Sequence, residues 1–388
     1  MSVHWQRISV PFDYPVYFTT DVLAEDNRDL VDAVTRKEPE RRHRLLVVVD
    51  DGVARAWPDL IGRMQAYVAR YAERMTLAAD PIVVPGGEQV KNDHGHLTAL
   101  HARLHALAID RQSLVVAVGG GAVLDMVGYA AATAHRGVRV IRVPTTVLAQ
   151  TDSGVSVKNG VNAFDSKNFL GSFAPPFAVL NDRGFLATLA RRDTIAGMAE
   201  AVKVALVRDA AFFGWLEAHT RELAAGELDA VAALIERSAR LHLAHIGGSG
   251  DPFELGSARP LDFGHWAAHK LEILTEHRLR HGEAVAIGMA VDACYGAEIG
   301  MLATAARDRI LGLLARLGLP TYDVALRLCG HDERPRILDG LAEFREHLGG
   351  DLTVTLLEDV GRGVEVHEMR DDAILRAIDS LAARDAAR

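Results

Sequence analysis

The most constraining feature of this sequence is a short apolar segment that runs directly into three glycines. Residues 114–118 read LVVAV, Gly119, Gly120 and Gly121 follow, and a helix-compatible stretch begins at Ala122. This pattern predicts a strand, a tight turn and a helix start. Glycines let a ligand approach the backbone, and the N–H groups at a helix N-terminus attract phosphate. The segment is therefore a candidate site for a nucleotide pyrophosphate.

A second apolar segment, residues 138–143, is a predicted strand that ends in Pro144-Thr145-Thr146. The threonine hydroxyls are suited to hydrogen-bond a ligand that lies over the strand ends. A polar and cationic stretch follows, with Asp152, Lys158, Lys167 and Asn168. The sequence thus predicts a phosphate site beside the nucleotide site.

Strand and helix signals alternate over the first half of the chain. Residues 45–49 and 82–84 are predicted strands, residues 57–75 and 97–107 are predicted helices, and residues 8–18 are an opening strand or hairpin. Alternation of this kind is typical of an α/β domain with a mainly parallel, Rossmann-like sheet.

Asp50 follows the first of these strands. A carboxylate at a strand end can bind a ribose hydroxyl. It can equally cap the next helix, and taken alone the capping interpretation is favoured.

The second half has a different composition, rich in Ala, Leu and Arg, and predicts a mostly α-helical domain. We place the domains at residues 1–183 and 184–388. The predicted helices cover residues 194–207, 228–246, 264–274, 283–299 and 305–317, and a hairpin is expected at 352–366.

Composition limits the function classes. A chain of 388 residues exceeds one ordinary core, and 49% hydrophobic with 24% charged residues is typical of a globular protein. The net charge of −9 argues against nucleic acid as a partner. Cys294 and Cys329 are too few for a disulfide framework, and the sequence shows no leader-like or membrane-spanning run. We expect a cytoplasmic protein with a small-molecule substrate and no membrane partner.

Three segments of the predicted helical domain carry metal-ligand chemistry. GMAEAVK places Glu200 and Lys203 three residues apart on one helical face, which by itself favours an exposed ion pair. Farther on, DFGHWAAHK contains His265 and His269, and HGEAVAIGM begins at His281. A carboxylate with two imidazoles suits a divalent ion such as zinc. We select Glu200, His265 and His281, and leave His269 as a fourth ligand or a donor to substrate.

The order of these motifs resembles the sugar-phosphate cyclases typified by 3-dehydroquinate synthase. The shared pattern is GGGxxxD, HRGVRVIRVPTT, TDSGVSVKNGVN, KN, GMAEAVK, DFGH, a histidine four residues later, and HGEAVAIGM, over roughly residues 45 to 300. The resemblance implies an NAD-binding α/β domain, a helical metal-binding domain and an active site in the cleft between them.

The resemblance also implies roles for individual residues. NAD would contact Asp50, Glu88, Lys91, Gly119, Gly120, Gly121, Asp125, Thr145 and Thr146. Glu200, His265 and His281 would bind zinc, with cobalt as a possible substitute. The catalytic group would be Asp152, Lys158, Lys203, Asp262 and His269. Substrate would also contact Lys167, Asn168, Arg259 and, across the interface of a homodimer, Arg136.

The implied reaction is a lyase reaction that uses NAD transiently. Oxidation of an alcohol acidifies the neighbouring C–H and permits phosphate elimination, after which reduction, ring opening and intramolecular aldol addition close a carbocycle. Zinc would polarise the reacting alcohol, and lysines would hold the phosphate dianion.

The sequence departs from the dehydroquinate synthase pattern where the substrate carboxylate would bind. Ala244 stands at a lysine position, Asp262 replaces the asparagine of NFGH, and Arg259 lies one residue closer to the histidine. A substrate carboxylate near Asp262 would be poorly compensated. FREHLGG, with Arg345, Glu346 and His347, replaces a paired-lysine segment.

These departures favour the sedoheptulose 7-phosphate cyclases, which make valiolone-type cyclitols for secondary metabolism. Within that branch the FREHLGG segment favours a 2-epi-valiolone product over 2-epi-5-epi-valiolone. The alternatives are 3-dehydroquinate synthase itself, a metal-dependent polyol dehydrogenase, which would lack the phosphate-binding lysines, and a non-catalytic cofactor-binding relative.

Overall fold

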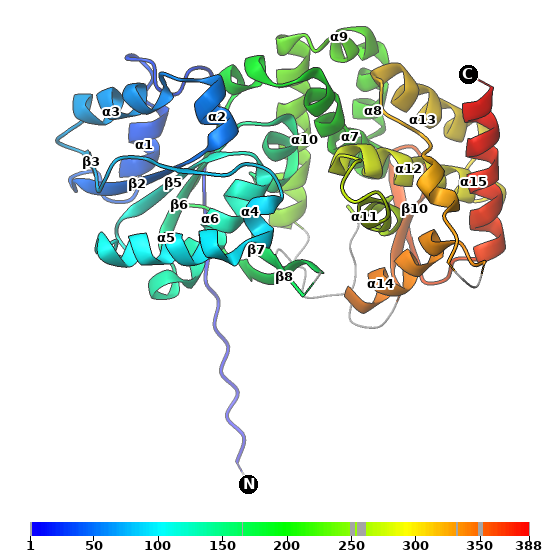
Figure 1. The fold of residues 1–388 in the computed structure, drawn as a ribbon, viewed down its shortest axis with the longest axis horizontal. Coiled ribbons are helices and arrows are strands. Elements are labelled where there is room, and N and C mark those ends of the chain that lie inside the picture. Colours follow the sequence, from blue (N-terminus) through cyan, green and yellow to red (C-terminus); the bar gives the residue numbers. More distant parts are fainter. Residues whose placement is uncertain are drawn as a thin grey trace. The chain divides into compact units, whose positions relative to one another are not determined.

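The chain is seen in a computed structural model that describes residues 2–164, 166–248, 253, 261–330, 333–347 and 352–387. It divides into two compact units (Figure 1). The first comprises Met1–Pro144 and Val157–Asp182, and the second comprises Thr145–Ser156 and Arg183–Arg388. Residues 145–156, inside the segment where the sequence predicts the nucleotide domain, thus belong to the second unit.

The first unit is built on a parallel sheet of seven described strands in the order β1-β9-β6-β5-β2-β3, with β4 also paired to β2. The strands are β1 (Val16–Thr19), β2 (His43–Asp50), β3 (Met75–Leu77), β4 (Ile82–Val84), β5 (Leu114–Gly119), β6 (Arg139–Pro144) and β9 (Ala178–Asp182). All six residues of β5 are buried, as expected for a central parallel strand covered on both faces.

Helices connect these strands and cover the sheet. They are α1 (Asp29–Thr35), α2 (Asp51–Ala56), α3 (Leu60–Arg70), α4 (Gln89–Asn92), α5 (His94–Ala106) and α6 (Gly121–Thr133). In Figure 1, α1 and α3 lie on one side of the sheet and α5 lies on the other. An antiparallel hairpin, β7 (Lys158–Ala163) and β8 (Ser166–Phe173), completes the unit.

Two expectations about the first unit are corrected. The helix predicted over residues 57–75 is shorter, because α3 ends at Arg70 and the chain re-enters the sheet as β3. Of the opening segment 8–18, only residues from Val16 onward form a strand, since Pro11 and Pro15 interrupt the preceding stretch.

The second unit is mostly helical. Its described helices are α7 (Arg191–Arg208), α8 (Ala210–Ala218), α9 (Thr220–Ala225), α10 (Leu228–Gly248), α11 (His265–Leu274), α12 (His281–Glu298), α13 (Thr304–Leu317), α14 (Asp339–His347) and α15 (Asp371–Ala386). The hairpin predicted near the C-terminus is present as β10 (Val354–Asp359) and β11 (Arg362–Val366). The fold class expected from the sequence, a parallel α/β domain with a helical domain, is confirmed.

Helix α12 is the centre of the second unit. It is buried along nearly its whole length and packs against α7, α11, α13 and α15. A helix that is apolar on all sides belongs in a core, which explains its sequence, EAVAIGMAVDACYGA.

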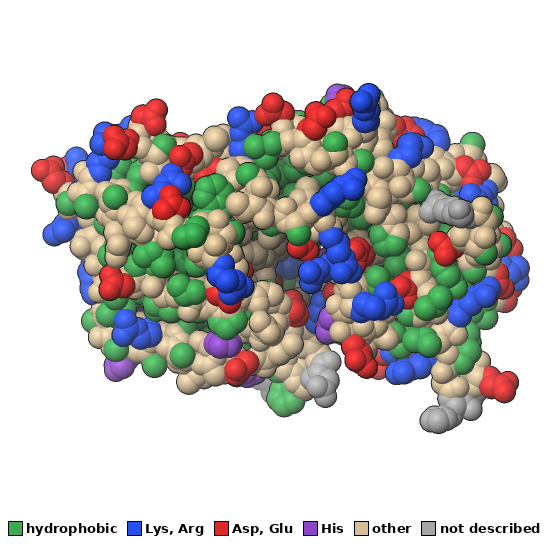
Figure 2. All heavy atoms as spheres, turned by 45° about the horizontal axis from the view of Figure 1, so that its top comes forward, with side chains coloured by type: hydrophobic (Ala, Val, Ile, Leu, Met, Phe, Trp, Pro, Cys, Tyr) green, Lys and Arg blue, Asp and Glu red, His purple; other side chains and the backbone are tan. Residues whose placement is uncertain are grey.

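No helix in the described part of the chain has the length and apolar character needed to cross a bilayer. The face drawn in Figure 2 carries acidic and basic side chains intermixed.

Candidate metal centre and active site

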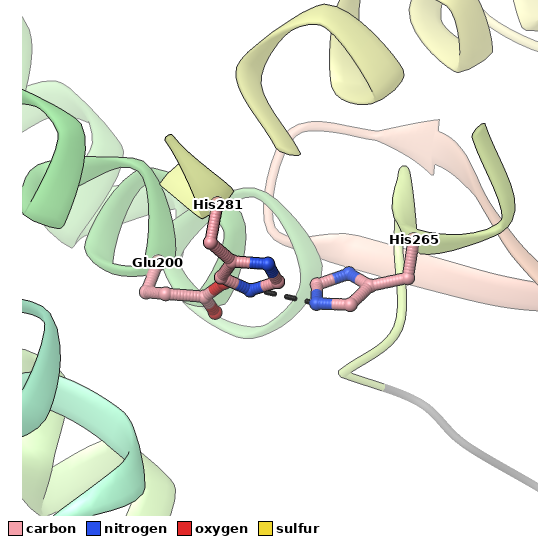
Figure 3. A group of neighbouring side chains, drawn as sticks. All are labelled: Glu200, His265 and His281. Atoms are coloured by element: carbon pink, nitrogen blue, oxygen red, sulfur yellow. Dashed lines mark ion pairs between the residues drawn. The ribbon is translucent and has the colours of Figure 1, made fainter. Parts of the chain in front are cut away.

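Glu200, His265 and His281 converge in the second unit. Their ligand atoms all lie within 4.8 Å of one another, and Figure 3 shows the carboxylate and the two rings gathered together. The Nε2 atoms of His265 and His281 lie 3.7 Å and 3.5 Å from the same oxygen, Oε1 of Glu200. Tetrahedral coordination at zinc distances places ligand atoms about 3.3 Å apart. The predicted ligand set therefore has the spacing of a metal site.

Close backbone approaches bring the three helices together. A β-carbon on Gly282 would lie 1.8 Å from the carbonyl oxygen of Ala196, and one on Gly288 would lie 2.0 Å from that of Gly264. Gly264 itself has a φ of +80°, a conformation that favours glycine. The glycines of DFGH and HGEAVAIG are thus required by packing, and they set the spacing of the ligand helices α7, α11 and α12.

The Glu200 carboxylate fits a cation. It is 1% exposed, and within the described residues neither of its oxygens has a hydrogen-bond partner of regular geometry. Lys203 forms an ion pair with one oxygen. Despite burial, Lys203 and the two imidazoles hold the pKa of Glu200 well below its usual range. The carboxylate is therefore ionised, and its Oε1, which both imidazoles approach, suits a metal ion.

The interpretation of Glu200 and Lys203 as an exposed pair is wrong. Both side chains are buried in α7, at 1% and 4% exposure. Although burial would lower the pKa of Lys203, the carboxylates of Glu200, Asp152 and Asp262 raise it. The ammonium is thus held charged among three carboxylates.

The two ligand imidazoles have their other nitrogens occupied. Nδ1 of His265 lies 3.3 Å from the carbonyl oxygen of Phe263, and Nδ1 of His281 lies 3.3 Å from Oε2 of Glu272. Burial, with the charge of Lys203, lowers the pKa of His265 to about 3. For His281, burial is outweighed by the carboxylates of Glu272 and Glu200, which raise its pKa to about 9. Acceptors at both Nδ1 atoms leave Nε2 as the ligand atom.

Further polar groups of the second unit surround this centre. The ring of His269 lies 5.5 Å from that of His265 and 6.3 Å from that of His281, and its side chain is exposed. Asp152 lies on η2 (Ala149–Ser153), a π-helical turn of a kind often found at functional sites. Its Oδ1 lies 3.2 Å from Nδ1 of His242 on α10. The sequence interpretation missed His242, which lies in a helix without a distinctive motif, and Glu272, which lies just beyond the DFGHWAAHK motif.

The glycine-rich turn of the first unit has the predicted form. β5 ends at Gly119, Gly120 is extended, and α6 begins at Gly121. Asp50 caps α2, with the Gly52 N–H donating to its carboxylate at 2.7 Å, as the capping interpretation expected. A β-carbon on Gly119 would lie 3.0 Å from that of Asp50, so the two strand ends lie side by side.

Four predicted residues of the first unit form one polar group. Lys91 is 4% exposed. Its Nζ lies 2.9 Å from Oδ2 of Asp125 and 3.8 Å from Oε1 of Glu88, and it donates to Oδ1 of Asn168. The structure therefore brings predicted NAD contacts together with a predicted substrate contact.

The remaining predicted residues are distributed between the units. In the first unit, Arg136 is exposed with a φ of +63°, Lys158 is exposed on β7, and Lys167 is half-buried on β8. In the second unit, Thr145 is buried, Thr146 accepts from the Ala149 N–H at 3.1 Å, and Asp262 is half-buried before α11. Arg259 lies outside the described residues.

The first unit is a parallel α/β unit with a glycine-rich strand–helix turn, and the second is a helical unit with a Glu-His-His centre. These features define a class of two-domain proteins that have a nucleotide-binding fold and a metal site. Family models match over nearly the whole central part of the chain. The family model for the 3-dehydroquinate synthase N-terminal region matches residues 81–196. The family model for the 3-dehydroquinate synthase C-terminal region matches residues 197–334. The chain belongs to the 3-dehydroquinate synthase family of sugar-phosphate cyclases, which are phosphate-eliminating carbon–oxygen lyases.

Individual relatives support this family. A 3-dehydroquinate synthase of Rhodopseudomonas palustris strain BisB18 is 37% identical over 85% of this chain and 85% of its own. One from Nitrosococcus oceani is 36% identical over 94% of this chain and 96% of its own.

Solved structures are also similar. 2-epi-5-epi-valiolone synthase from Streptomyces hygroscopicus subsp. jinggangensis 5008, determined with NAD⁺ and Zn²⁺ bound, has a TM-score of 0.85 and 29% identity over 98% of this chain and 100% of its own. A probable glycerol dehydrogenase from Sinorhizobium meliloti 1021 has a TM-score of 0.58 and 17% identity over 97% of each chain, which shows a shared fold.

Proposed function

We propose that this protein is an NAD- and zinc-dependent cyclase that converts sedoheptulose 7-phosphate to a valiolone-type cyclitol with release of phosphate. The observation that carries the cyclase proposal is the convergence of Glu200, His265 and His281. The related 2-epi-5-epi-valiolone synthase contains both NAD⁺ and Zn²⁺. When bound, these groups would supply Lewis-acid polarisation of an alcohol and reversible hydride transfer.

The chain's own residues would bind and orient the sugar phosphate around this centre. Lys203 would stabilise negative charge that develops on the substrate oxygen next to the metal ligands, because its ammonium is buried and held charged. His269 would donate to a second substrate oxygen, since its ring is exposed beside both ligand rings. Lys158, Lys167 and Asn168 are proposed to bind the phosphate dianion.

The Asp152–His242 pair is suited to move a proton. A carboxylate 3.2 Å from an imidazole nitrogen orients the ring for proton transfer. The Asp152 carboxylate also raises the pKa of Lys203, so the Asp152–His242 pair interacts electrostatically with Lys203.

Charge supports the choice of a substrate without a carboxylate. Three carboxylates already surround Lys203, and one of them, Asp262, replaces the family's asparagine. Ala244 on α10 cannot supply the cation that the family's lysine would give. A keto-acid phosphate would therefore meet repulsion that an uncharged ketose head does not.

Within this branch we propose 2-epi-valiolone as the product. The support is the segment Arg345-Glu346-His347 at the end of α14, where the family carries paired lysines. A homodimer is also proposed, in which Arg136 would contact the phosphate of the other subunit.

The second candidate is 3-dehydroquinate synthase, which the 36–37% identity to enzymes of that name favours. A single experiment distinguishes the candidates. Zinc-loaded protein with NAD is incubated separately with sedoheptulose 7-phosphate and with the seven-carbon keto-acid phosphate of the shikimate pathway. Phosphate, NADH and the product's nuclear magnetic resonance spectrum are measured, with Glu200→Gln as the control.

The proposal expects phosphate from sedoheptulose 7-phosphate without net NADH, and a spectrum of 2-epi-valiolone. Turnover of the keto acid alone would establish the synthase instead. Stoichiometric NADH without phosphate release would indicate a polyol dehydrogenase.

A further inference from the structure

We propose that Asp292 and Glu272 are positioning residues that orient the two ligand imidazoles, each helix supplying the carboxylate that serves the histidine of the other. Glu272 lies on α11, which begins with His265, and acts on His281. Asp292 lies on α12, which begins with His281, and acts on the backbone around His265.

Asp292 orients the ring of His265 indirectly, through the peptide group between Phe263 and Gly264. Its Oδ2 accepts from the N–H of Gly264 at 3.0 Å. That N–H belongs to the same planar peptide as the carbonyl of Phe263, which accepts from Nδ1 of His265 at 3.3 Å. Fixing the N–H therefore fixes the direction of the carbonyl, and the carbonyl fixes the ring.

A second bond holds Asp292 itself. Its Oδ1 accepts from Nε1 of Trp266 at 2.8 Å, so the carboxylate bonds to the residues on both sides of His265. Asp292 and Trp266 are each 1% exposed. A buried carboxylate with both oxygens used in this way is a rigid contact between α11 and α12.

The action of Glu272 on His281 is direct. Its Oε2 lies 3.3 Å from Nδ1, and the residue is 3% exposed. A carboxylate at this nitrogen selects the tautomer whose Nε2 lone pair is available as a ligand, and strengthens that ligand. Loss of such a partner typically weakens metal binding by about 10–100-fold.

The test measures zinc binding by the full chain in competition with a chromophoric chelator. Asp292→Asn keeps the side-chain size but places an amide NH₂ against an N–H donor, and Glu272→Leu removes the partner of His281. Each is expected to raise the zinc dissociation constant about 10–100-fold and to change the visible spectrum of cobalt-loaded protein. Glu272→Gln keeps an acceptor at Nδ1 and is expected to restore most of the affinity.

Cys294→Ala is the matched structural control, because Cys294 is buried on α12 two residues after Asp292. It is expected to bind zinc as the natural chain does. The unfolding free energy of the metal-free protein is measured for every variant, so that a loss of stability is distinguished from a loss of zinc affinity. Zinc constants within about twofold of the natural chain for Asp292→Asn and Glu272→Leu would overturn the inference, as would an equal loss in Cys294→Ala.

The inference rests on the proposed function only in that the triad binds a metal ion. Failure of zinc binding by the natural chain would defeat both proposals. Normal zinc binding with the expected variant losses, but no phosphate release from either sugar phosphate, would defeat the cyclase proposal and support the positioning role.

Discussion

Gly282, the second residue of α12, lies against the backbone carbonyl of Ala196 in α7, so closely that a β-carbon at position 282 would be 1.8 Å from that oxygen. Ala196 precedes Glu200 by one helical turn, and Gly282 follows His281 directly. The separation of two ligand-bearing helices is therefore set by the absence of a side chain.

Gly282→Ala is expected to force α12 away from α7. Overpacking of this kind costs about 1–3 kcal/mol of unfolding free energy, and the shift separates His281 from Glu200. Chemical denaturation and zinc titration measure the two effects. Gly214→Ala in α8, where a β-carbon would meet nothing within 4 Å, is the control and is expected to be neutral or stabilising. Equal behaviour of the two variants would contradict the packing argument.

Glu200→Gln removes the anionic ligand of the triad. We expect zinc affinity to fall by at least about 100-fold, and phosphate release to fall with it, because a neutral amide is a poor zinc ligand. Metal analysis after dialysis against a weak chelator measures the loss. Glu236→Gln, an exposed residue of α10 paired with Arg240, should retain its zinc. Full zinc content in Glu200→Gln would refute the assigned site.

Lys91→Met is expected to destabilise the first unit by about 3 kcal/mol near neutral pH, because it leaves Asp125 without its 2.9 Å partner. Burial raises the pKa of Asp125 even with Lys91 opposing it. A carboxyl whose pKa is higher in the folded than in the unfolded state loses stability as the pH rises through the folded value. The deficit should therefore be larger at pH 7 than at pH 5.

Denaturation midpoints at the two pH values test this prediction. Lys91→Met/Asp125→Asn, which removes the charge as well, should recover much of the loss at pH 7. A deficit that is independent of pH would point to lost packing rather than to an unpaired carboxylate.

The two cysteines are expected to differ in reactivity. Burial raises the pKa of Cys294 to about 11, whereas Cys329 is exposed. At pH 8 a chromogenic disulfide reagent should therefore titrate one thiol in the folded protein and two in denaturant. Cys329→Ser should abolish the folded-state signal, and rapid reaction of both native thiols would show that the core around α12 opens.

Asp262→Asn combined with Ala244→Lys restores the charges of the dehydroquinate synthase pattern. We expect the ratio of kcat/KM for the keto-acid phosphate over sedoheptulose 7-phosphate to rise at least about tenfold, by removal of one repulsion and addition of one attraction. Asp262→Asn combined with Ala244→Gln is the control, because glutamine adds side-chain length at position 244 without charge. An unchanged ratio in the lysine variant would show that charge at these positions does not select the substrate.

The strand–glycine–helix unit and the metal triad could be predicted because their signals are local and repeated. The segment LVVAVGGG predicts a buried strand followed by a turn. Glu200, His265 and His281 each lie within a recognisable sequence motif. The burial of Glu200 with Lys203 was predictable in principle, since α7 is apolar around most of its circumference from Thr194 onward.

Other features depend on tertiary packing that no local pattern shows. Asp292 stands among apolar residues between Glu283 and Glu298 of α12, and its role arises from its contact with the peptide group before α11. His242 gains significance only through its contact with Asp152, which lies far earlier in the chain. The crossing of residues 145–156 into the second unit likewise leaves no mark in the sequence pattern.

The position of β9 in the sheet has a consequence for biosynthesis. β1 pairs only with β9 among the described strands, and β9 is the last strand of the sheet to leave the ribosome. The opening strand must therefore wait, through the synthesis of more than half of the first unit and a segment that joins the second, before its hydrogen-bonding partner exists. A chain cut after Pro144 or after Ser156 would lack β9 and would have an unfinished sheet edge, so the first unit is expected to complete its sheet only after residues 145–156 of the second unit have been made.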